Sequence, residues 1–202
     1  QIATVLSTAI IVTLGSRCIC DSCGTGVLCQ PLVKIFRSAR DNLSSGERTL
    51  RQLLDSFIRE RIHSDNTMRV GCALMSLPMP KNETHTVHTK NSLTEDYDVL
   101  LTTVTIIRQI RATEVSPKYA SRLDELELAV YNVICSLNMV LHQYGDHIDR
   151  YAVIDPVVFI CTASSNEEKY LRDFTLLRGI QDILKPLKNK NDIVTFAISR
   201  GI

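Results

Sequence analysis

Apolar residues recur every three or four positions along four stretches of the chain, which is the spacing of one face of an α-helix. The stretches cover about residues 30–62, 92–113, 117–144 and 166–188. Long connections join the first stretch to the second and the third to the fourth, whereas a short one joins the second to the third. Crossing a bundle from end to end needs a long loop, and turning straight back needs a short one. The pattern therefore predicts an all-α fold, an up-up-down-down long-chain four-helix bundle.

Local signals refine these helices. Ser92-x-x-Glu95 and Ser165-x-x-Glu168 are capping boxes, which predict the starts of the second and fourth helices. Ser116 followed by Pro117 predicts the start of the third.

Two segments leave alternatives open. Residues 102–107 are rich in β-branched side chains, so a strand is the alternative to a helix there. Pro186 should kink or end the fourth helix, and residues 189–202 are expected to follow as a semi-apolar tail.

The N-terminus carries a short apolar run that does not belong to the four helical stretches. Residues 2–14 are apolar or small and are too few to span a bilayer, which fits the core of a signal peptide. We expect a signal peptide at residues 1–18 and one helical domain at 19–202; a buried N-terminal strand or helix is the alternative. No later stretch is apolar and long enough for a membrane span. We therefore expect a secreted, extracellular protein without membrane insertion.

The chain has seven cysteines, at positions 18, 20, 23, 29, 72, 135 and 161. The first four could be read as metal ligands, but no second paired knuckle and no His-x3-His follows. After a signal peptide, disulfides are the better interpretation. Cys20 and Cys23 could bond to each other or to an outside partner.

Two Asn-x-Ser/Thr sequons are present. Asn82-Glu-Thr84 lies in a polar loop, so we expect N-glycosylation at Asn82. Asn42-Leu-Ser44 also matches but lies within the first predicted helix, so it is the less trusted of the two.

Composition excludes several classes of function. The formal net charge is +1, which gives no general attraction to nucleic acid. The five histidines are scattered, and no metalloprotease, hydrolase-elbow, dinucleotide or P-loop motif occurs. We expect no enzyme activity, no cofactor and no bound metal, and a protein that acts by presenting helix faces to partners.

Several segments resemble the leukaemia inhibitory factor and oncostatin M branch of the interleukin-6 family of long-chain helical cytokines. They are Leu53-Leu-Asp-Ser-Phe-Ile-Arg59, the spacing of Cys29 and Cys72 on either side of it, Tyr131-Asn-Val-Ile-Cys135 and Leu176-Leu-Arg-Gly179. The resemblance touches most of residues 29–185. It implies a secreted cytokine that assembles cell-surface receptors and so triggers signalling.

The same resemblance implies two disulfides. One would join Cys29 to Cys135 and tie the start of the first helix to the third. The other would join Cys72 to a cysteine early in the fourth helix, where this chain has Phe174. Cys161 is the nearby substitute, which makes Cys72–Cys161 the second expected pair.

The family's receptors contact two faces. The first and third helices engage glycoprotein 130, and here the candidates that point away from the apolar stripes are Arg40, Glu47, Arg51 and Asn132. Tyr131 is a further candidate, because it falls between the stripe positions Val130 and Val133 and is expected to be half-exposed; packing on a loop is the alternative. The start of the fourth helix engages a leukaemia-inhibitory-factor-receptor-type or oncostatin-M-receptor-type chain through a Phe-x-x-Lys motif. This chain lacks that motif and has Glu167-Glu-Lys-Tyr170 in its place, so Glu167, Lys169 and Tyr170 are the candidates, with Glu167 and Lys169 expected to be exposed.

We expect the protein to be a monomer until it meets its receptors. The alternatives are another helical cytokine, such as an interferon, and a secreted helical carrier or decoy. An interferon-like protein would differ in cysteine pairing. A carrier would need a cavity between its helices.

Overall fold

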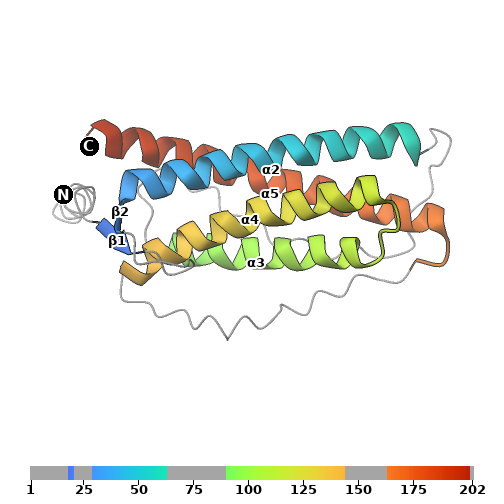
Figure 1. The fold of residues 1–202 in the computed structure, drawn as a ribbon, viewed down its shortest axis with the longest axis horizontal. Helices are drawn as coiled ribbons and strands as arrows, with labels where there is room; N and C mark the ends of the chain where they lie inside the picture. Colours follow the sequence, from blue (N-terminus) through green and yellow to red (C-terminus); the bar gives the residue numbers. More distant parts are fainter. Residues whose placement is uncertain (1–17, 21–28, 63–89, 144–162, 201–202) are drawn as a thin grey trace.

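Four long helices form the body of the protein in a computed structural model, which describes residues 18–20, 29–62, 90–143 and 163–200 (Figure 1). The helices are α2 (Leu32–Glu60), α3 (Lys90–Ala112), α4 (Pro117–Gln143) and α5 (Asn166–Arg200). α2 packs against α4 and α5, and α3 packs mainly against α4. The predicted all-α four-helix bundle is confirmed at this level.

Two three-residue strands precede the bundle, and the sequence patterns did not predict them. β1 (Cys18–Cys20) pairs with β2 (Cys29–Pro31) in antiparallel register, with Cys20 opposite Cys29. β1 contacts α4, and β2 contacts α2. The two strands therefore lie beside the helices at the end where α2 begins (Figure 1).

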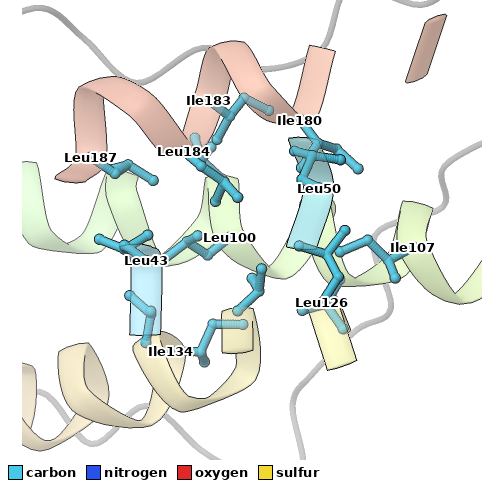
Figure 2. Close-up of a cluster of buried hydrophobic side chains, with 14 of the residues drawn as sticks. Leu43, Leu50, Leu100, Ile107, Leu126, Ile134, Ile180, Ile183, Leu184 and Leu187 are labelled. Carbon is cyan, nitrogen blue, oxygen red and sulfur yellow. The ribbon is translucent and has the colours of Figure 1, made fainter. Parts of the chain in front are cut away.

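The core of the bundle is formed by aliphatic side chains from all four helices (Figure 2). Leu43 of α2, Leu100 of α3 and Leu184 of α5 each have 1% of their surface exposed or less. A Cβ added at Gly46 of α2 would meet Ala129 of α4 at 3.5 Å, so the two helices approach closely there. Burial of these predicted stripes is the main stabilising contribution to the fold.

The β-branched segment of α3 is helical, so the alternative of a strand is wrong, and the helix accommodates its threonines. The hydroxyls of Thr102, Thr103 and Thr105 each donate to the carbonyl four residues earlier, at 2.9–3.1 Å. Because the helix itself satisfies these hydroxyls, a threonine as buried as Thr103 costs little.

The start of α3 differs from its prediction. The helix begins at Lys90, so Ser92 lies inside its first turn rather than at its cap. The Ser92 hydroxyl is buried and accepts a hydrogen bond from Lys190 of α5 at 2.8 Å. The Ser92 side chain therefore makes a tertiary contact with α5 instead of the helix-capping contact that the local pattern predicted.

The prediction that the fourth helix ends at Pro186 and is followed by a tail is also corrected. The helix runs through Pro186 to Arg200, so the expected tail is helical over most of its length. Pro186 cannot donate to the carbonyl of Asp182, but Asp182 lies on the exposed side of the helix, where water can reach it. Leu184 and Leu187 are buried on either side of the proline and hold the helix on the bundle.

The remaining predicted boundaries agree with the structure within a few residues. α4 begins at Pro117, and the Ser116 carbonyl accepts the first helical hydrogen bond, from the Ala120 N–H at 2.9 Å. The expected signal peptide, apart from Cys18, lies outside the described residues.

Candidate functional site

The outward side of α4 carries an exposed apolar pair. Leu128 is 61% exposed and Tyr131 is 47% exposed, although both are large apolar side chains. Asn132, beside Tyr131, is exposed and donates a hydrogen bond to the side-chain oxygen of Asn42 on α2, at 3.3 Å. We call Leu128, Tyr131 and Asn132 the outer face of α4. The predicted half-exposure of Tyr131 is confirmed.

The α2 residues of the same predicted surface differ in environment. The Arg40 guanidinium lies 2.8 Å from the Asp41 carboxylate. Arg51 is well exposed and makes an ion pair with Glu47 at 3.3 Å. Arg51 points toward solvent, as the helical pattern predicted, whereas Arg40 is only partly exposed.

Glu47 was predicted to point away from the core, and this is only partly right. Its carboxylate accepts a hydrogen bond from Lys188 of α5 at 3.0 Å, and only 16% of its side chain is exposed. That hydrogen bond lowers the pKa of Glu47, although partial burial opposes the shift. Glu47 therefore joins α2 to α5 and offers little surface to a partner.

The start of α5 is capped as predicted. The Ser165 hydroxyl accepts a hydrogen bond from the Glu168 N–H at 3.1 Å. Glu168 accepts hydrogen bonds from the hydroxyl and the N–H of Ser164, rather than from Ser165, and these lower its pKa. Glu167 is exposed, as expected.

Lys169 was predicted to be exposed, and this is wrong. Only 15% of its side chain is exposed, and its ammonium lies 3.4 Å from the carboxylate of Asp173. Asp173 is fully buried and also pairs with Arg172 at 2.7 Å. Burial nevertheless raises the pKa of Asp173. Lys169 turns inward because a buried carboxylate one helical turn later needs a cation.

Tyr170, the third α5 candidate, belongs to a cluster at this end of the bundle. The Arg61 guanidinium lies 4.8 Å from the ring centroid of Phe57, 3.7 Å from that of Tyr119 and 4.5 Å from that of Tyr170. The Arg61 guanidinium also donates two hydrogen bonds to the Glu114 carboxylate, at 2.6 and 2.9 Å. We call these five residues the Arg61 cluster.

Electrostatic effects in the Arg61 cluster reinforce one another. Burial alone would raise the pKa of Glu114, but hydrogen bonds from Arg61 and from the Ser116 N–H lower it below its ordinary value. Burial and a hydrogen bond to Glu60 raise the pKa of Tyr119 to about 12. A charged arginine, an ionised glutamate and a neutral tyrosine therefore persist together at neutral pH.

Of the Arg61 cluster only Tyr170 was among the predicted candidates, and Leu128 was not predicted either. Arg61 and Glu114 lie beyond the ends of two different helices, where periodicity carries no information about contacts. Leu128 did leave a signal, because it is a large apolar residue that falls off the buried stripe of α4.

The expected disulfides and the expected N-glycosylation at Asn82 remain predictions. Cys135 is partly buried on α4, and the backbone of Cys29 lies in β2. Cys72, Cys161 and Asn82 lie outside the described residues.

The described residues show no metal site and no membrane span. Nowhere among them do three His, Cys, Asp or Glu side chains gather as metal ligands. Over the same residues, no helix combines the length and the apolar character needed to cross a membrane.

Comparison with known proteins identifies no relative. The chain matches no protein-family model, no curated protein and no solved structure at a significant level.

Proposed function

We propose that the protein is a secreted helical cytokine of the interleukin-6 type, which binds and assembles cell-surface receptors. The observation that carries the proposal is the outer face of α4, where Leu128 and Tyr131 are exposed on a helix whose other large apolar residues are buried. Half-exposed tyrosines next to apolar side chains are common anchors of protein interfaces. The protein would act without catalysis, cofactor or metal, by bringing receptors together.

The contacts of the Arg61 cluster, at one end of the bundle, support the up-up-down-down order that such cytokines share. Arg61, just after α2, donates a hydrogen bond to Glu114, just after α3, and its guanidinium lies against the rings of Tyr119 in the first turn of α4 and Tyr170 near the start of α5. Two helices that end where two others begin have the proposed directions.

Two separate surfaces would serve two receptors. The outer face of α4, with Arg40 and Arg51 of α2, would bind a receptor of the glycoprotein 130 type. The start of α5, with Glu167 and the edge of Tyr170, would bind a leukaemia-inhibitory-factor-receptor-type or oncostatin-M-receptor-type chain. The exposed Val115, in the turn between α3 and α4, is at the same end of the bundle as Tyr170 and would add apolar contact there.

A carrier or decoy is less well supported, because it needs a cavity. At the centre of the bundle a Cβ on Gly46 would already meet Leu126 at 3.6 Å and Leu184 at 3.8 Å. An interferon-like cytokine differs from our proposal chiefly in its disulfides. Oxidised Cys29–Cys135 and Cys72–Cys161 pairs in the mature protein would support the interleukin-6 type, and a Cys135 thiol recovered unoxidised would count against it.

Binding to an immobilised glycoprotein 130 ectodomain tests the proposal. We expect the folded chain to bind. Tyr131→Ala should raise the dissociation constant about tenfold or more, since removal of a central aromatic anchor costs about 2 kcal/mol of binding free energy. Arg178→Ala, an exposed change on α5, is the matched control and should leave binding unchanged. Absence of binding by the folded chain, or equal effects of the two variants, would refute this assignment.

A further inference from the structure

The sequon Asn42-Leu43-Ser44 lies within α2, a place where glycosylation is not usually sought. Its three residues face different surroundings. Leu43 is a core residue with 1% of its surface exposed, whereas Asn42 is partly exposed and lies between the exposed Asp41 and the partly exposed Ser44. The acceptor side chain is therefore at the surface of the folded protein.

The hydrogen bonds of the Asn42 amide are compatible with a saccharide. Its Nδ2 donates to the carbonyl of Ser38 at 2.8 Å and more weakly to the Ser38 hydroxyl at 3.4 Å, and its Oδ1 accepts from the Nδ2 of Asn132 at 3.3 Å. N-glycosylation replaces only one of the two hydrogens on Nδ2. The modified amide keeps one N–H to donate to Ser38 and its oxygen to accept from Asn132.

The space around Asn42 is open on the side away from the core. Ser38, one turn earlier, and Ser45, three residues later, are exposed, and Asn132 on the neighbouring helix is exposed too. A bulky polar group attached at Asn42 would extend over solvent rather than into the bundle.

We propose that Asn42 carries an N-linked saccharide in the secreted protein. In the transfer, Nδ2 of Asn42 forms a bond to C1 of an oligosaccharide while the bond from C1 to the phosphate oxygen of a lipid diphosphate donor breaks. The amide loses one proton, and the lipid diphosphate leaves. Transfer takes place while the chain enters the secretory compartment, where the acceptor has to be reached.

The modification would sit beside the surface proposed to bind a receptor. Because Asn132 of the outer face of α4 contacts Asn42 directly, a saccharide at Asn42 lies over the seam between α2 and α4 and borders that face at Asn132. It would set which part of that face a partner can approach. The inference rests on the proposed function in one respect, because only a chain that enters the secretory compartment meets the transferase.

Site-resolved mass spectrometry tests the proposal. The full chain is secreted from eukaryotic cells behind a cleavable leader and treated with a peptide-N-glycosidase in water enriched in heavy oxygen, which converts a glycosylated asparagine to labelled aspartate. We expect residue 42 to be recovered as labelled aspartate. Recovery of unmodified Asn42 from the secreted protein would overturn the proposal.

Two matched variants sharpen the test. Ser44→Ala removes the sequon and keeps Asn42, so the label at residue 42 should vanish. Ser44→Thr keeps the sequon, so the label should remain. Both substitutions are small and lie on a partly exposed position of the helix. Receptor binding is measured separately on the Ser44→Ala protein, so a failure of the proposed function is distinguished from a failure at Asn42.

Discussion

Arg61 and Glu114 are both removed from water, with 9% and 0% of their side chains exposed. A charge buried in this way is tolerated because its partner and the surrounding rings replace the lost hydration. Removing one member leaves the other charge buried without compensation.

We therefore predict that Arg61→Met lowers the free energy of unfolding by about 3–5 kcal/mol at pH 7. The loss should shrink as the pH falls. With Arg61 present, the pKa of Glu114 lies below its ordinary value of 4.5, so the pair stabilises the fold above about pH 4.5 and loses this effect as the pH falls through the lowered pKa. Without Arg61, burial raises the pKa of Glu114, and the residue can protonate inside the fold.

Urea unfolding of both proteins between pH 7 and pH 3 measures this difference. Arg59→Met, at an exposed position two residues away, serves as the control and should change stability by less than about 0.5 kcal/mol. A constant loss across the whole pH range would contradict the assignment to Glu114.

Gly46 is buried in the middle of α2, where glycine is unfavourable because it loses more backbone entropy on folding than alanine does. A Cβ there would lie 3.5 Å from the nearest side-chain atom, which is ordinary contact. We predict that Gly46→Ala raises the free energy of unfolding by about 0.5–1 kcal/mol, measured by chemical denaturation. Gly46→Leu should instead lower it by about 1–3 kcal/mol through overpacking. Destabilisation by alanine would show that the helices approach more closely than described.

The helices themselves were largely predictable from the sequence. Stripes such as Leu43–Leu50 on α2 and Leu123–Val140 on α4 repeat at the helical period, and burying them decides where the helices lie. Prediction failed where tertiary contacts override local signals. Ser92 bonds to Lys190 instead of capping α3, and α5 continues past Pro186 because its buried leucines outweigh one lost hydrogen bond.

The link between α3 and α5 gives a prediction at the scale of these elements. Lys190 donates hydrogen bonds to both carboxylate oxygens of Asp96 at 3.0 Å, and Asp96 has only 3% of its side chain exposed. Lys190→Met should lower the free energy of unfolding by about 3–5 kcal/mol, because the Asp96 carboxylate stays buried without its cation. The effect is measured as the difference in the midpoint of thermal unfolding between Lys190→Met and the control Lys185→Met, a substitution at an exposed position of the same helix. Equal midpoints for the two variants would mean that this contact does not hold α5 in place.

At the scale of the whole molecule, periodicity predicted the bundle but only part of the candidate surfaces. Tyr131 was correctly placed because its position lies just outside a buried stripe. Lys169 was not, because its inward turn depends on Asp173, and no local pattern reveals that a carboxylate in the core needs a cation. The Arg61 cluster was unpredictable for a related reason, since its members come from three helices and from the segments just after α2 and α3, which meet only in the folded protein.

We propose that the bundle bridges two receptors, which bind separate surfaces. The outer face of α4 is one surface, and the start of α5 is the other. A bridge must hold both partners at once, whereas a carrier or a decoy need not.

Sedimentation velocity of the folded protein mixed with the ectodomains of glycoprotein 130 and of a leukaemia-inhibitory-factor-receptor-type or oncostatin-M-receptor-type chain tests this most directly. We predict one complex that contains all three proteins. Tyr131→Ala should release glycoprotein 130 from it while the second receptor stays bound. If the folded protein joined neither receptor, or if the two receptors competed for one surface, the account would be contradicted.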